Sequence, residues 1–169
     1  MLSDAQSIAT ALARSPSQAA TVGTGAVRLT AMAWGTGAQL QREALADWGQ
    51  VLRIRARVVV HQPCERLVVS YHVKNRQNQH VTGGHTGTLP GVYERAWQPG
   101  DVVDVEFTTP VQWHDGAYTL TMLAASIGDV QHYSDAVFHD WADDVAALDR
   151  LREVTEAHIK RFNESQSRY

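Results

Sequence analysis

The chain has 169 residues, enough for one domain with a sizeable core, and its formal net charge of −3 gives neither a nucleic-acid backbone nor an anionic membrane an electrostatic advantage as partner. Cys64 is the only cysteine, which excludes an internal disulfide and a cluster of thiolate metal ligands. No apolar run approaches the ~20 residues that span a bilayer, and the N-terminus lacks the features of a signal peptide, so we expect a soluble, cytoplasmic protein.

Residues 1–22 are predicted to be a linker or a marginal helix. They are rich in Ala, Ser and Gln, and their few apolar residues form only a short stripe at helical spacing. The alternating sequence AVRLTAMA at 26–33 predicts a first strand. Residues 38–49 are irregular, with Leu40, Ala44 and Leu45 spaced for a short helical turn.

The clearest alternation of apolar and polar side chains is VLRIRARVVVH at 51–61, which predicts a strand with one buried face. The next segment, Cys64 to Gly84, predicts a hairpin whose two strands are joined by a turn at Asn75 to Asn78. In the first strand of this hairpin, Leu67, Val69, Tyr71 and Val73 would face the core, and Val68, Ser70, His72 and Lys74 the solvent.

The chain after the hairpin contains further candidate strands. The glycines of Gly83 to Gly87 would supply a flexible crossing with positive φ angles, and 92–97 is predicted to be an edge strand. Alternating residues around 103–107 and 116–126 predict two more strands. In the second of these, Tyr118, Leu120, Met122 and Ala124 would face the core.

Beyond Phe138 the apolar residues recur every three to five positions, which predicts a helix from about Trp141 onward. The fold predicted for the chain is therefore all-β: an immunoglobulin-like or jelly-roll-like antiparallel β-sandwich with a short C-terminal helix. Its predicted organisation is a lead-in at 1–22, the sandwich at 23–148, and a helical or exchanged segment at 149–169.

Some histidines and carboxylates of the sequence could form a metal or catalytic site, and each also has a simpler structural interpretation. His80 with His85, or His114 with Asp115, could ligate a metal, but no established ligand motif is present and surface histidines are the better interpretation. Asp104 and Glu106 on one strand could be the two catalytic carboxylates of a glycosidase. Charged residues at alternate positions more often belong to the solvent-exposed face of a sheet. We therefore predict no enzymatic activity, no metal and no cofactor.

Five tryptophans, several of them next to turns, suggest a carbohydrate-binding surface, because aromatic rings stack on sugar rings while polar side chains bind the hydroxyls. The competing interpretation is that these tryptophans close the ends of the sandwich.

The sequence resembles the C-terminal carbohydrate-binding domain of Wzt, the nucleotide-binding component of ABC transporters that export O-antigen polysaccharides. The resemblance covers residues 24–148. It is carried by VLRIRARVVVHQPCERLVVSYHVKNRQNQHVTGGHT, WQPGDVVDVEF, DGAYTLTMLAAS and HYSDAVFHDWADD in that order. The turn at Asn75 to Asn78 lacks the family's usual glycine, and Gly84-His85-Thr86 replaces a segment that contains Asn.

This resemblance implies a non-catalytic module that binds the end of an undecaprenyl-linked glycan and selects it for export. It further implies a homodimer that exchanges C-terminal segments, and partnership with the ATPase domain and membrane subunit of the transporter at the cytoplasmic face of the inner membrane. The chain would then be a domain excised from behind an ATPase domain, although a stand-alone or differently fused version stays open.

The binding site is predicted from sheet geometry. If the strand of His72 and the strand of Tyr118 lie in one sheet, their outward residues form a continuous polar floor for the glycan terminus. Its predicted members are Ser70, His72, Lys74, His85, Trp113, Thr119, Thr121 and Tyr133. A protein-interaction module and, less favoured, a glycoside hydrolase remain as alternative functions.

Overall fold

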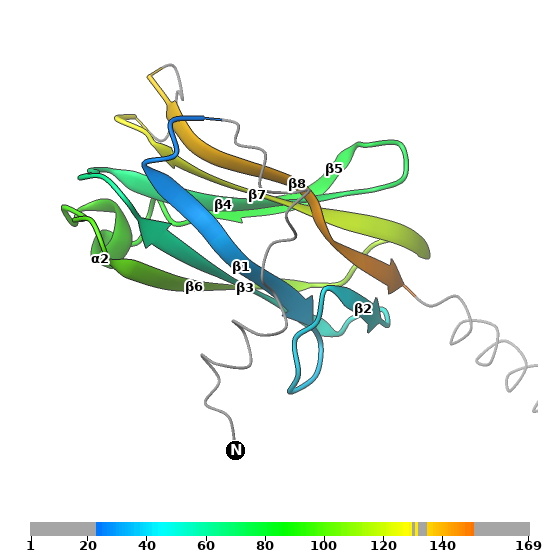
Figure 1. The fold of residues 1–169 in the computed structure, drawn as a ribbon. Coiled ribbons are helices and arrows are strands. Elements are labelled where there is room, and N and C mark those ends of the chain that lie inside the picture. Colours follow the sequence, from blue (N-terminus) through cyan, green and yellow to red (C-terminus); the bar gives the residue numbers. More distant parts are fainter. Residues whose placement is uncertain (1–22, 130, 132–134, 151–169) are drawn as a thin grey trace, which may run out of the picture.

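The computed structural model describes residues 23–129, 131 and 135–150, and these residues form two β-sheets packed face to face (Figure 1). The strands are β1 (Val27–Gly35), β2 (Glu43–Ala46), β3 (Val51–Val60), β4 (Leu67–Lys74), β5 (His80–His85), β6 (Val102–Pro110), β7 (Gly116–Ser126) and β8 (Val137–Arg150), and a one-turn helix, α2, spans Pro90–Tyr93. The predicted β-sandwich is confirmed.

The two sheets differ in size and connectivity. One has three strands in the order β1-β3-β6, and the other has five in the order β2-β8-β7-β4-β5. Neighbouring strands are antiparallel except for β2, which runs parallel to β8. The strands β4 and β7, which carry most of the predicted floor, are direct neighbours.

Alternating side chains fill the space between the sheets, as the period-two patterns predict. On β3, Leu52, Ile54 and Val58 are completely buried, and on β4 Leu67, Val69 and Val73 are too. The four inward residues predicted on β7 all belong to the same core. The core therefore lies where the sequence placed it for the strands with regular alternation.

Strands β1 and β8, which belong to different sheets, are joined across the sandwich by polar contacts. The Leu29 backbone N–H donates to Asp140 Oδ2 at 2.9 Å, and the Trp34 indole N–H donates to the Ala147 carbonyl at 3.0 Å. Asp140 and Trp34 are both fully buried. These bonds fix β8 relative to the smaller sheet, and β8 in turn supplies part of the candidate site.

The predicted hairpin is confirmed, and its turn closes without glycine. Asn78 has φ of 61° and donates its N–H to the Asn75 carbonyl at 3.0 Å, while Asn75 Oδ1 accepts the N–H groups of Gln77 and Gln79. Asparagine adopts a left-handed conformation more readily than other residues with a Cβ. It therefore takes the place of the expected glycine.

The helix predicted from Trp141 is wrong for residues 141–150, which belong to β8. The register between β7 and β8 shifts twice. At one shift, Leu120 lies opposite Ala146 and Met122 lies opposite Ala142, so two positions along β7 correspond to four along β8. Three residues, 143–145, therefore lie between core-facing Ala142 and Ala146, which breaks the period-two alternation from which a strand is predicted. The predictions for 1–22 and for 151–169 lie outside the described residues.

Three shorter predictions also need correction. Residues 43–46, within the stretch where a helical turn was expected, form the strand β2, and the expected edge strand at 92–97 is preceded and partly replaced by α2. Pro90 occupies the start of α2, where proline's fixed φ and missing N–H fit a helix. Gly83 and Gly84 lie within β5 and do not have positive φ angles.

The described residues contain no helix with the length and hydropathy that a bilayer crossing requires.

Candidate functional site

The outward face of the five-stranded sheet brings together most of the predicted floor. His72 of β4 lies opposite Thr121 of β7, and Lys74 lies opposite Thr119. On the other side of β4, Ser70 lies opposite His85 of β5. These residues share one face because their inward neighbours, such as Tyr71 and Leu120, belong to the core. We call this the polar face.

The polar face is less exposed than the sequence suggested. Thr121 is completely buried, and Ser70 and Lys74 are 7% and 9% exposed. His72, Thr119 and His85 are partly exposed. Neighbouring side chains cover the residues in the middle of the sheet, so a ligand would reach this face mainly through the groups that lie over them. Tyr133 lies outside the described residues.

The principal group over the middle of the polar face is the carboxylate of Asp143, which sequence reasoning assigned to the start of a helix. Its Oδ1 accepts hydrogen bonds from Thr121 Oγ1 and Trp141 Nε1, both at 3.0 Å, and from Lys74 Nζ at 3.3 Å. The Asp143 side chain nevertheless keeps 56% of its surface exposed. One oxygen is thus held in place while the carboxylate still faces solvent.

The bulge in β8 explains how Asp143 reaches this position. Residues 143–145 of β8 are accommodated between the pairs formed by Ala142 and Ala146, opposite the single residue Thr121 of β7. A bulge bends its strand and redirects side chains, and such bulges recur next to functional sites. No local sequence signal predicts these contacts, since Lys74 is 69 residues away and Thr121 is 22 residues away along the chain.

The network stabilises the ionised form of Asp143. Partial burial alone would raise the pKa of this carboxyl group, but hydrogen bonds from Trp141, Thr121 and Lys74, together with the charge of Lys74, outweigh burial and lower the pKa below its usual value. The group is therefore a carboxylate at neutral pH, which accepts hydrogen bonds from hydroxyl groups more strongly than a neutral acceptor does.

His72 contributes a neutral imidazole beside this carboxylate network. Its ring stacks on that of His80 with centroids 4.8 Å apart. Burial, followed by the neighbouring charges of His80 and Lys74, lowers the pKa of His72. In the neutral form one ring nitrogen donates and the other accepts, so His72 can act as donor or as acceptor in a hydrogen bond with a hydroxyl group.

An apolar region adjoins the polar face at the end of the sheet where β4 begins and β7 ends. Val68, Leu123, Ala125 and Ile127 form a small outer cluster, against which Tyr93 and Trp141 pack. Phe138 lies against Trp141 with ring centroids 5.5 Å apart at 60° and remains 41% exposed. An exposed aromatic ring thus lies near a fixed carboxylate, with Trp141 contacting both.

The tryptophans divide between the two interpretations offered by the sequence. Trp34, Trp97 and Trp113 are buried and belong to the core, as the structural interpretation expects of a tryptophan that closes the sandwich. Trp48 is 59% exposed, with the guanidinium of Arg150 5.4 Å from its ring centroid. Trp141, partly buried, is the tryptophan that takes part in the polar network.

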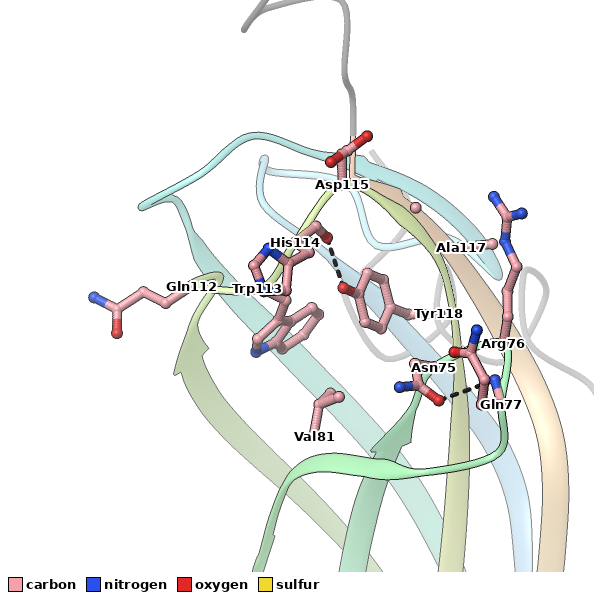
Figure 2. A pocket seen from close by; sticks show the side chains of 11 residues that line it. Asn75, Arg76, Gln77, Val81, Gln112, Trp113, His114, Asp115, Ala117 and Tyr118 are labelled. Atoms are coloured by element: carbon pink, nitrogen blue, oxygen red, sulfur yellow. Dashed lines mark hydrogen bonds between the residues drawn. The ribbon is translucent and has the colours of Figure 1, made fainter.

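Trp113, which was expected at one end of the floor, lines a separate hollow (Figure 2). This hollow has a volume of about 580 Å³ and lies where the β4–β5 turn approaches the loop that precedes β7. The ring centroids of Trp113 and Tyr118 are 5.0 Å apart, and the Tyr118 hydroxyl donates to the His114 carbonyl at 2.6 Å. We call this hollow the end cavity.

The carboxylates and histidines that were considered as catalytic or metal-binding residues make local structural contacts. Asp104 and Glu106 lie on β6 of the smaller sheet, where Asp104 pairs with Arg57 at 2.9 Å and Glu106 with Arg53 at 3.4 Å. Among the described residues, no three His, Cys, Asp or Glu side chains gather as metal ligands would. His85 Nδ1 instead accepts the Gly87 N–H at 3.0 Å.

Comparisons with known proteins agree with this fold. The family model described as the Wzt C-terminal domain matches residues 18–158. A crystal structure of the C-terminal domain of Wzt is similar with a TM-score of 0.68 and 18% identity, over 86% of this chain and 84% of that one. A Niemann-Pick type C2 protein from the Japanese carpenter ant is similar with a TM-score of 0.55 and 5% identity, over 78% and 97% of the two chains. No curated protein matches.

Proposed function

The chain belongs to the Wzt C-terminal domain family, and on that premise we propose that it recognises the terminus of an O-antigen polysaccharide and thereby selects the glycan for export by an ABC transporter. This family consists of non-catalytic domains of an ABC transporter component. The proposal adds the ligand, an undecaprenyl-linked glycan end, and the place of binding, the polar face around Asp143.

The observation that carries the proposal is the half-exposed carboxylate of Asp143, anchored by Thr121, Trp141 and Lys74. A ligand that binds here does not have to immobilise the acceptor, because three donors already hold it. Binding to a group that is ordered beforehand avoids part of the entropy cost of association. Charge-assisted hydrogen bonds to hydroxyl groups are stronger than neutral ones.

The neighbouring groups suit the remaining features of a sugar. Neutral His72 can donate or accept a hydrogen bond. Thr119, the outward-facing residue of β7 next to Thr121, adds a partly exposed hydroxyl. Phe138 offers an exposed aromatic ring beside Trp141, on which the C–H face of a sugar can pack. The combination of an aromatic surface with convergent polar groups is typical of small-molecule recognition.

The proposed partners follow from family membership. We propose a homodimer that works with the ATPase domain and membrane subunit of the transporter, at the cytoplasmic face of the inner membrane. Within such an assembly the domain would hold the glycan end near the transporter without altering it chemically.

Asp143→Asn tests the proposal, because the amide keeps the shape of the carboxylate and removes its charge. The wild-type chain should be retained on an affinity matrix or array of bacterial O-polysaccharides, and Asp143→Asn should weaken its binding to the retained polysaccharide at least tenfold. The fold should be kept, with at most a modest fall in melting temperature, because the amide oxygen can still accept the hydrogen bonds of Thr121 and Trp141.

Asp104→Asn is the matched control, since it makes the same chemical change in an exposed ion pair on the other sheet. It should leave polysaccharide retention unchanged. Equal retention of wild type and Asp143→Asn would exclude the polar face as the binding site, and no retention of wild type on any O-polysaccharide would favour a protein-interaction module instead.

A further inference from the structure

Trp113, which lines the end cavity, has an indole N–H without a partner among the described residues. Trp34 and Trp97 donate their indole N–H groups to backbone carbonyls, those of Ala147 and Val92, each at 3.0 Å. Trp113 is 9% exposed, yet its indole N–H makes no hydrogen bond within the described part of the chain. Buried tryptophans usually find a partner for this group, so the N–H of Trp113 is free to donate to water or to a bound molecule.

The walls of the cavity are held in place by their own contacts. The Tyr118 hydroxyl is bonded to the His114 carbonyl, and its ring packs against Trp113 (Figure 2). A tyrosine hydroxyl is protonated at neutral pH, and burial raises the pKa of Tyr118 further, so the bond persists there. On the opposite wall, Asn75 Oδ1 accepts the N–H groups of Gln77 and Gln79. The cavity is therefore largely formed before anything binds.

The size and rim of the cavity indicate the class of ligand. Its volume of about 580 Å³ lies within the roughly 300–1,000 Å³ typical of small-molecule sites. Gln77, Gln112 and His114 are exposed residues of its lining. Amide and imidazole groups both donate and accept, which matches the hydroxyl groups of a neutral sugar.

The end cavity also continues the polar face. Lys74 and Thr119 are paired across β4 and β7 at the end of that face. Asn75, which follows Lys74, and Tyr118, which precedes Thr119, both line the cavity. A chain of sugar residues bound over Asp143 could extend along the strands and enter the cavity without leaving the surface.

We propose that the end cavity is a second saccharide subsite, which holds a short segment of the same glycan and binds it through the indole N–H of Trp113. This inference rests on the proposed function, because it assumes that the ligand of the polar face is a glycan. Its consequence is that recognition reads more than one position of the polysaccharide.

Ala117→Trp tests the inference by filling the cavity without removing a core side chain. The probe is a ladder of fluorescently labelled oligosaccharides, prepared by partial hydrolysis of an O-polysaccharide that the wild-type chain retains. Affinity of the wild type should rise with length as the glycan reaches the cavity. Ala117→Trp should lose at least tenfold in affinity for the longest members and little for the shortest that bind.

Thr108→Trp is the matched control, because it adds the same side chain at an exposed position of β6 on the other sheet. It should bind like the wild type. If Ala117→Trp also binds the whole ladder like the wild type, the cavity is not a subsite, while the proposed function stands. If wild type binds no oligosaccharide or polysaccharide, both proposals fail.

The indole resonance of Trp113 provides a readout that does not depend on a variant's folding. In a ¹⁵N–¹H spectrum, long oligosaccharides should shift the Trp113 indole signal downfield, as expected when its N–H gains an acceptor, and leave the signals of Trp34 and Trp97 in place. Trp113→Phe should lower affinity for the same oligosaccharides by severalfold. An unmoved Trp113 signal at saturating oligosaccharide would overturn the subsite.

Discussion

The outer faces of the two sheets carry similar charges in different arrangements. On the smaller sheet, Arg53 and Arg57 pair with Glu106 and Asp104 across neighbouring strands, and the groups are exposed or partly exposed. On the larger sheet, Lys74 is nearly buried, and its partner Asp143 also collects Thr121 and Trp141. Regular cross-strand pairs keep a sheet surface solvated, whereas the bulge on the larger sheet concentrates donors on one acceptor.

Physical magnitudes separate these two arrangements further. Exposed ion pairs contribute about 0–1 kcal/mol each to stability, because water competes and two side chains must be ordered. The Asp143 network includes a completely buried hydroxyl, that of Thr121, and a buried group that loses its partner costs more than an exposed one. The larger sheet should therefore respond to substitutions that leave the smaller sheet unaffected.

The largest expected effect comes from behind the polar face, at Gly84. A Cβ atom there would lie 2.8 Å from Cε1 of Tyr71, a core residue whose ring is 4.8 Å from that of Phe107 in the opposite sheet. Gly84→Ala should destabilise the fold by about 1–3 kcal/mol, the usual range for overpacking, as measured by chemical denaturation. Gly91→Ala, at a position with no neighbouring atom within 4 Å, should have little effect.

A loss as small for Gly84→Ala as for Gly91→Ala would show that Tyr71 moves aside freely. In that case the close approach of β5 to the core would not be what requires glycine.

Thr121→Val and Thr108→Val compare the two outer faces directly. Both replace threonine by a β-branched residue of similar shape in a strand. Thr121→Val removes a buried hydroxyl that donates to Asp143 and should cost about 1 kcal/mol, in keeping with the net value of a hydrogen bond. Thr108 is exposed, so Thr108→Val should stay within about 0.5 kcal/mol of wild type.

Thermal or urea unfolding of both variants would measure this difference. Equal stabilities would mean that the network around Asp143 adds nothing to the fold beyond what the exposed pairs of the other sheet add.

The sequence predicted the parts of the fold in which alternation is local and uninterrupted. The inward residues of β3, β4 and β7 and the hairpin around Asn75 follow directly from period-two patterns. In β8 the bulge places three residues between core-facing Ala142 and Ala146, and this interrupts the alternation by which a sequence pattern identifies a strand. Strand β2 was missed because its pairing partner, Ala147 to Arg150, lies more than a hundred residues away.

The candidate site was predicted in outline and missed at its centre. Alternation placed His72, Lys74, Thr119 and Thr121 on one face, and the adjacency of β4 and β7 brings them together. Asp143 joins them only through the register shift in β8, which depends on tertiary packing. The complete burial of Thr121 was also not predicted, because alternation along β7 shows only which face a residue lies on and not what packs over that face.

The smallest expected effect is the pH dependence contributed by His72. Burial and the charges of His80 and Lys74 lower its pKa in the folded state, so the unfolded chain binds a proton at a higher pH than the folded one does. The stability associated with neutral His72 is therefore fully present above the ordinary histidine pKa of about 6.5. It is lost as pH falls from there through the lowered folded-state pKa.

Urea unfolding between pH 7.5 and pH 5 should show this loss, and His72→Asn should make the stability less dependent on pH over that interval. Identical slopes for the two proteins would mean that the imidazole is protonated as readily in the folded chain as in the unfolded one, and the larger sheet would then lack the desolvation that distinguishes its outer face from that of the smaller sheet.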